Sequence, residues 1–176
     1  MTTWLRVALA AQLLFFAGWG GVLLTSHRDA AIVWLATEPV DPRDLLSGHY
    51  VALRYRIAST IGPDCPVPAE GEAVPVWVQL AENGETIPTG EGYVVISDGV
   101  TCQPWPPDRG TGVMWIAGKL ESSGRIVYGI ERMFVAEESP LREATSGTVV
   151  AKIALNDRFE PRIVGLVSKT PATATP

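Results

Sequence analysis

Residues 41–57 read D-P-R-D-L-L-S-G-H-Y-V-A-L-R-Y-R-I and indicate the fold class. From residue 49 onward, one side chain in two is apolar or aromatic, which is the period of a β-strand with one buried face. That face would carry His49, Val51, Leu53, Tyr55 and Ile57. Before the strand, Asp41-Pro42 and Gly48 are typical of turns. We interpret the segment as a loop that leads into a half-buried strand.

Similar runs recur along the chain, separated by turns that draw on 17 glycines and 14 prolines. The candidate strands are residues 31–37, 49–57, 74–81, 92–97, 112–120, 125–135, 148–155 and 162–168. Asn83-Gly84 and Ser123-Gly124 have the composition of hairpin turns, and the second would join residues 113–120 to 125–135. The pattern predicts an all-β fold, either an antiparallel β-barrel or a sandwich.

The N-terminal segment has a different character. Val7 to Ser26 are twenty residues without a charge, enough for a helix of about 30 Å, the hydrocarbon thickness of a bilayer. We therefore predict a transmembrane helix at residues 5–26, a β-domain at 30–168 and a flexible tail at 169–176. The alternative is a cleaved signal peptide, although its apolar core is usually only about 7–15 residues long.

Two cysteines indicate the compartment. Cys65 and Cys102 both stand in proline-rich, loop-like sequence, which suits a disulfide in an oxidising compartment; two free thiols are the alternative. Arg6 precedes the span, and the charges after it give only a weak orientation bias. We expect a single-pass protein of the inner (cytoplasmic) membrane with its C-terminal domain on the extracytoplasmic, periplasmic side.

The charge balance argues against one class of partner. The formal net charge is −5, and Arg6 is the only charged side chain before the end of the apolar run, so the chain after Arg6 carries −6. Proteins that bind nucleic acid neutralise phosphates with lysine and arginine, and an acidic domain lacks that electrostatic attraction. We therefore expect no nucleic-acid partner.

Three short motifs occur in order behind the span: residues 39–43, residues 48–55 and residues 128–132 with Phe134 and Val135 after them. Together they resemble the GDYxxLxY family of bacterial membrane-anchored proteins. The residues that carry the resemblance are Asp41, Pro42, Arg43, Gly48, Tyr50, Leu53, Tyr55, Gly129 and Glu131. His49 stands where the family name has aspartate, which weakens any role that rests on that carboxylate. The resemblance implies association with a multi-spanning membrane protein and no established activity.

Catalytic, metal and cofactor sites are not predicted. A zinc site needs three or four ligands, and two histidines with two cysteines in loops do not supply them. Glu131 is a single carboxylate, interpreted as a buried partner of an arginine such as Arg54, with acid–base catalysis as the alternative. A peptidase-like mechanism needs a serine with a lysine base, but none of the candidates stands in a recognisable motif: Ser47, Ser59, Lys119 and Lys152. We expect no enzyme.

Two surfaces are candidates for binding partners. A stripe of small residues follows one face of the span, where another helix can approach closely: Ala17, Gly18, Gly21 and Thr25. On the domain, Trp105 lies between prolines and is expected in an exposed loop, and Tyr50 is a second candidate contact.

We therefore expect a non-catalytic accessory or scaffolding subunit of a larger bacterial membrane complex, for which a respiratory or photosynthetic complex is a candidate host. Its partners would be integral membrane proteins in a hetero-oligomer, together with the bilayer. The alternative is an extracytoplasmic binding module for a small molecule or an envelope polymer, which a pocket around Tyr50, Tyr55 and Glu131 would favour.

Overall fold

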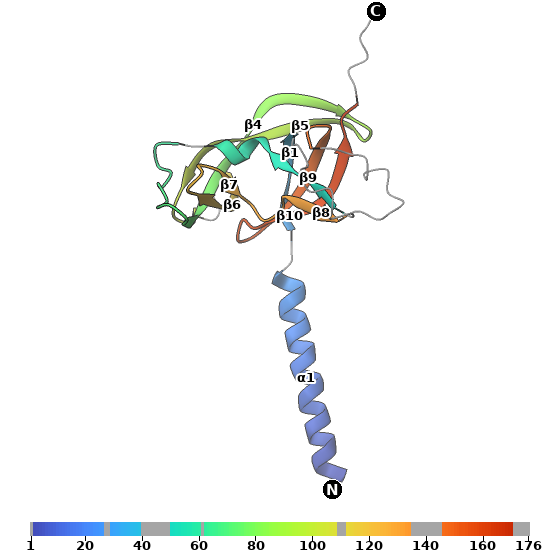
Figure 1. The fold of residues 1–176 in the computed structure, drawn as a ribbon. Helices are drawn as coiled ribbons and strands as arrows, with labels where there is room; N and C mark the ends of the chain where they lie inside the picture. The colour runs from blue at the N-terminus through green and yellow to red at the C-terminus, as the bar shows by residue number, and fades with distance from the viewer. Residues whose placement is uncertain are drawn as a thin grey trace, which may run out of the picture.

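The computed structural model describes residues 2–26, 29–39, 50–60, 62–108, 112–134 and 146–170. It confirms the all-β prediction: one N-terminal helix precedes a domain of antiparallel strands (Figure 1). The elements are α1 (Thr2–Ser26), β1 (Asp29–Glu38), β2 (Tyr50–Ala52), β3 (Arg54–Tyr55), the 3-10 turn η1 (Arg56–Ser59), β4 (Ala73–Thr89), β5 (Gly92–Gln103), β6 (Met114–Glu121), β7 (Ile126–Val127), β8 (Arg132–Phe134), β9 (Val149–Asn156) and β10 (Pro161–Ser168).

The strands form two four-stranded sheets and one two-stranded ladder. The sheets run in the orders β10-β9-β1-β3 and β5-β4-β6-β7, and β2 pairs with β8 between them. A backbone hydrogen bond of 2.8 Å from Ala117 N of β6 to Phe159 O, in the β9–β10 turn, ties the two sheets together. An isolated bridge between Thr89 and Lys169 ties them at another point. The domain is thus a partly open barrel of two curved sheets.

One hydrophobic core fills the space between the sheets. The alternation read from the sequence is confirmed here, because Val76, Val78 and Leu80 of β4 are all buried. They pack in one cluster with Val33 and Leu35 of β1 and with residues of β6 and β9. A second, smaller cluster lies where the long β4–β5 hairpin covers the other face of β1, and it consists of Ala36, Val94, Ile96 and Val150. The hairpin therefore buries part of both faces of the first sheet.

Two of the expected strands are interrupted. Residues 49–57 divide into β2, β3 and the turn η1, and residues 125–135 contribute β7 and β8 with no strand between them. The expected hairpin at Asn83-Gly84 is wrong: these residues form a bulge inside β4, and the hairpin turn falls at residues 90–91 instead. Asn83 Oδ1 accepts a hydrogen bond from Glu85 N (2.8 Å), so its turn chemistry is used without reversing the chain. The turn at Ser123-Gly124 is confirmed.

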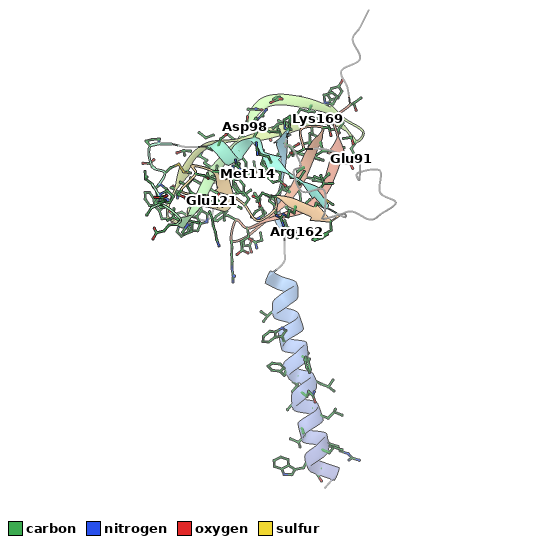
Figure 2. The ribbon with its side chains drawn as sticks, in the orientation of Figure 1. Glu91, Asp98, Met114, Glu121, Arg162 and Lys169 are labelled. Carbon is green, nitrogen blue, oxygen red and sulfur yellow. A yellow bond between two sulfur atoms is a disulfide. The ribbon has the colours of Figure 1, made fainter. Side chains whose placement is uncertain are left out.

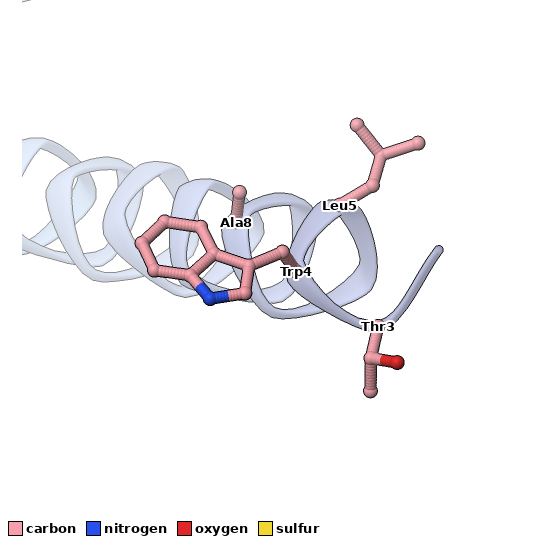
Figure 3. Close-up of a pocket in the computed structure, with 4 residues that line it drawn as sticks. All are labelled: Thr3, Trp4, Leu5 and Ala8. Atoms are coloured by element: carbon pink, nitrogen blue, oxygen red, sulfur yellow. The ribbon is translucent and has the colours of Figure 1, made fainter. Parts of the chain in front are cut away.

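The helix α1 contains a segment, Thr3–Val22, that is long and apolar enough to cross a bilayer, and none of it is buried by the domain. This is compatible with a single-pass membrane anchor. Figure 3 shows Trp4, Leu5 and Ala8 projecting from the first turns of the helix. The space between them is open surface on a single helix and not a binding cavity. Trp4 is 85% exposed, as expected for an aromatic side chain at a membrane interface.

The two ends of the domain face different ways. Figure 2 shows Arg162 at the end next to α1 and Lys169 at the opposite end. Lys169 N donates to Thr148 O, and Thr170 N donates to Pro88 O, each at 2.9 Å. The first two residues of the predicted tail are thus hydrogen-bonded to the domain, and residues 171–176 lie outside the described part, where the flexible tail stays a prediction.

Candidate functional site

The second and third sequence motifs, some 75 residues apart, meet in the structure. β2 pairs antiparallel with β8, with Val51 opposite Met133 and Ala52 opposite Arg132. Where the ladder ends, Leu53 N donates a 2.7 Å hydrogen bond to Glu131 O. Segment 50–55, which includes β3 of the first sheet, and segment 128–134, which follows β7 of the second sheet, therefore form one unit that connects the two sheets.

Two tyrosines hold this unit by a reciprocal exchange. Tyr55 Oη donates to the carbonyl oxygen of Ile130 at 2.8 Å, and Tyr128 Oη donates to the carbonyl oxygen of Ile57 at 2.9 Å. The Tyr55 hydroxyl thus satisfies a carbonyl of the third motif, and the Tyr128 hydroxyl satisfies a carbonyl two residues after the second motif. Tyr55 is 1% exposed and Tyr128 is 6% exposed, so both bonds are shielded from water. We call this pair the tyrosine clasp.

The loop between the two strand ends is shaped by Gly129 and Glu131. Gly129 has φ +78°, a conformation that side chains other than glycine rarely adopt. Across the same turn, Glu131 Oε1 accepts a 2.5 Å hydrogen bond from Tyr128 N. Glu131 is therefore held by a backbone N–H, and no ion pair with Arg54 is found among the described residues, unlike the arginine pairing that we expected.

Tyr128 also requires a glycine beneath its ring. A Cβ added to Gly118 of β6 would lie 3.0 Å from Tyr128 Cδ1 and 2.7 Å from Ile126 Cγ2. Such distances are shorter than packed carbon atoms tolerate. The absence of a side chain at Gly118 lets the ring lie against β6, which joins the clasp to the second sheet.

The sequence similarity of the chain identifies its family. The family model described as GDYXXLXY protein matches residues 14–166, most of the chain. The chain belongs to the GDYXXLXY family. Comparison with curated proteins gives no match, and comparison with solved structures gives none either.

Within the GDYXXLXY signature, the structure assigns packing roles to the residues it describes. Leu53 and Tyr55 are buried in the main core, on the same face as Val51 and Ile57, as the alternation predicted. The backbone of Tyr50 pairs with Phe134, and its side chain lies outside the described part. Asp41, Pro42, Arg43, Gly48 and His49 also lie outside it, so their predicted roles stay predictions.

The electrostatics of the clasp keep the tyrosines neutral. Burial, and then the negative charge of Glu131, raise the pKa of Tyr55 and of Tyr128 above the ordinary value. Both effects disfavour the phenolate. At neutral pH the two hydroxyls are therefore donors with protons in place, which suits a structural hydrogen bond rather than proton transfer.

A pocket of about 270 Å³ opens beside the clasp. Tyr55 and Glu131 line it, together with three arginines and a second glutamate: Arg54, Arg125, Arg132 and Glu121. The sequence suggested a pocket around Tyr50, Tyr55 and Glu131, and Tyr55 and Glu131 are among the residues that line this one. Because the Tyr55 hydroxyl is already bonded, the arginines and glutamates supply the polar groups at the mouth.

The remaining predicted residues lie apart from the clasp. Trp105 is 57% exposed in its loop, as expected. Cys65 and Cys102 form the predicted disulfide. Ala17, Gly18 and Gly21 lie on α1, and the side chain of Thr25 on the same stripe is not described. Lys152 lies over the Trp34 ring with its Nζ 5.2 Å from the ring centroid, and Ser59 Oγ donates to Arg56 O. Ser59 and Lys152 therefore do not have the geometry of a serine–lysine pair.

One polar cluster has no motif in the sequence. Arg56 binds Asp98 of β5 through two bonds, Nε–Oδ1 at 2.8 Å and Nη2–Oδ2 at 2.9 Å, and its Nη1 lies 2.8 Å from Glu85 Oε2. The cluster pins η1 to the β4–β5 hairpin at the bulge. Arg56 follows the signature by one residue, but its partners stand 29 and 42 positions later, so no local pattern marks the set.

Proposed function

We propose that this GDYXXLXY protein is a non-catalytic accessory subunit of a larger bacterial membrane complex, held by α1 in the inner membrane. The observation that carries the proposal is the open small-residue face of α1. Among the described residues, no atom lies within 4 Å of a Cβ added at Gly18, so the described packing does not require that glycine. Small residues let a second helix approach closely, and association in lipid depends on such packing.

The proposed topology places the β-domain outside the cytoplasm. The disulfide supports this side, because structural disulfides persist in oxidising compartments. Only two residues separate α1 from β1, an inner strand of the first sheet. An integral membrane partner that packs against α1 would therefore lie directly beneath the domain. A respiratory or photosynthetic complex is a candidate host.

The test is recovery of partners with the full chain. The tagged protein is extracted in a mild detergent, its assembly size is measured, and co-purifying chains are identified by mass spectrometry. Gly21→Leu places bulk on the stripe and is expected to reduce partner recovery by about tenfold. Gly20→Leu is the matched control, since it adds the same side chain about 100° around the helix.

Two results would oppose the subunit function. A wild-type protein that runs as a lone monomer contradicts it directly. Equal recovery with Gly21→Leu and Gly20→Leu would remove the role of the helix stripe.

A second candidate is a binding module for a small molecule, and the pocket beside the clasp favours it. Its arginines and glutamates come from β3, from the β6–β7 turn and from segment 131–132. The volume of about 270 Å³ lies just below the usual range of about 300–1,000 Å³ for ligand sites. Thermal stabilisation of wild type, and not of Arg54→Gln, by a small ligand would favour this function over the first.

A further inference from the structure

A second aromatic site lies on the outer face of the β4–β5–β6 sheet, away from the clasp. Gln79 of β4 stands between Thr101 of β5 and Trp115 of β6 in one row across the sheet. In the next row, Gln103 stands opposite Trp77. Side chains two positions apart on a strand share a face, so two tryptophans and two glutamines lie together on this face.

The loop after β5 converts this face into a hollow. Trp105 projects from the loop and is 57% exposed, whereas Trp115 on the sheet is only 9% exposed. The two tryptophans line a hollow of about 300 Å³. The other lining residues are Gln79, Gln103, Pro106, Pro107, Asp108 and Val113. Trp115 forms the floor and Trp105 the rim. The volume reaches the lower end of the range of about 300–1,000 Å³ for ligand sites.

The rim is held in place from below. Gln103 Nε2 donates a 2.8 Å hydrogen bond to Trp105 O. Cys102, the residue before Gln103, is fully buried and is bonded to Cys65. Prolines on both sides of Trp105 restrict the backbone further. Such pre-organisation lowers the entropic cost of ligand binding.

We propose that this hollow binds a neutral carbohydrate. Indole faces offer an apolar surface on which the C–H face of a sugar ring can stack. Glutamine amides donate and accept hydrogen bonds, and a carboxylate accepts them, which matches hydroxyl groups that do both. An envelope glycan is the chemical class that these groups fit.

Other ligand classes fit less well. Among the described lining residues none is cationic, and the chain after Arg6 carries a net charge of −6, which disfavours anions. A quaternary ammonium ligand would use the tryptophans and Asp108 but leave both amides unused. A proline-rich peptide would use the aromatic groove in a similar way, so it is included as a competing outcome.

The test uses the full chain in phosphatidylcholine nanodiscs, because detergents with sugar headgroups would compete for the site. Calorimetric titrations use chitotetraose and maltotetraose as probes, with choline and a proline-rich peptide as alternatives. We expect saturable binding of an oligosaccharide, weakened about tenfold or more by Trp105→Ala and by Gln79→Leu. Tyr93→Ala is the matched control, since Tyr93 is an aromatic residue that is 80% exposed at the other end of the hairpin.

Each outcome of the titrations either supports or overturns carbohydrate binding in the hollow. Binding of chitotetraose alone assigns an amino-sugar polymer, and binding of maltotetraose alone assigns a glucan. No heat from either sugar, undiminished binding by Trp105→Ala, or binding of choline or the peptide in place of the sugars overturns it. Melting curves confirm that each variant is folded. The result is independent of the subunit function, which co-purification measures.

Discussion

At the residue scale, the family signature is a set of packing and hydrogen-bonding residues. Leu53 and Tyr55 are buried in the core, and the hydroxyls of Tyr55 and Tyr128 donate to the main-chain carbonyls of Ile130 and Ile57. Gly118 lets the second ring lie against β6. The described residues of the signature therefore stabilise the fold, and the absence of catalysis stays a prediction.

The clasp gives the first prediction. Tyr55→Phe keeps the ring but leaves the Ile130 carbonyl without its partner, so the free energy of unfolding should fall by about 1–3 kcal/mol. Tyr128→Phe should cost a similar amount for the Ile57 carbonyl. Urea unfolding of each variant measures the change. Tyr93→Phe is the control, because Tyr93 is exposed; a clasp variant as stable as this control would contradict the structural role.

At the element scale, tertiary contacts decide where strands stop. The alternation in residues 49–57 correctly predicted which face is buried. The segment is nevertheless not one strand, because β2 pairs with β8 whereas β3 pairs with β1 and is followed by the turn η1. Asn83-Gly84 bends β4 without ending it, since the bulge lets Asn83 Nδ2 reach Asp98 Oδ2 at 2.5 Å. The long β4–β5 hairpin can therefore curve over both faces of the first sheet.

The disulfide joins the segment before β4 to the end of β5, at a sequence separation of 37. Closing a loop of this length stabilises the fold by roughly 4 kcal/mol in the chain-entropy model. Cys65→Ser should therefore lower the melting temperature markedly, and serine can still accept the hydrogen bond from Gly62 N. Calorimetry of wild type and variant under oxidising conditions measures this; equal melting temperatures would show that the bridge does not stabilise the domain.

At the scale of the whole molecule, few backbone hydrogen bonds join the two sheets in the described part. The clasp, the bond from Ala117 to Phe159 and the Thr89–Lys169 bridge are the principal backbone or buried polar links in the described part. Because two of the clasp groups are titratable, global stability should depend on alkaline pH.

The raised pKa of Tyr55 and Tyr128 sets the direction of that dependence. Above the unfolded pKa of about 10, the unfolded chain loses protons that the folded chain keeps, so stability is full below about pH 10 and falls as pH rises. The slope is at most about 1.4 kcal/mol per pH unit for each tyrosine. Lys169, whose pKa is lowered chiefly by burial, acts in the opposite sense.

Urea unfolding between about pH 8 and 11 measures this dependence. Tyr55→Phe should remove its own share of the slope, whereas Tyr93→Phe should leave the slope unchanged. An identical alkaline slope in wild type and Tyr55→Phe would show that the buried phenol is not the titrating group.

Local periodicity and composition were enough to predict the all-β class, the apolar span, the buried face of the signature and the cysteine pair. Three contacts could be found only in the folded structure: Tyr55 and Tyr128 hold each other's segments, Glu131 accepts a hydrogen bond from Tyr128 N, and Trp105 and Trp115 line one hollow. Those contacts join residues from different strands, and the pairing of strands is set by the packing of the whole core rather than by any short stretch of chain.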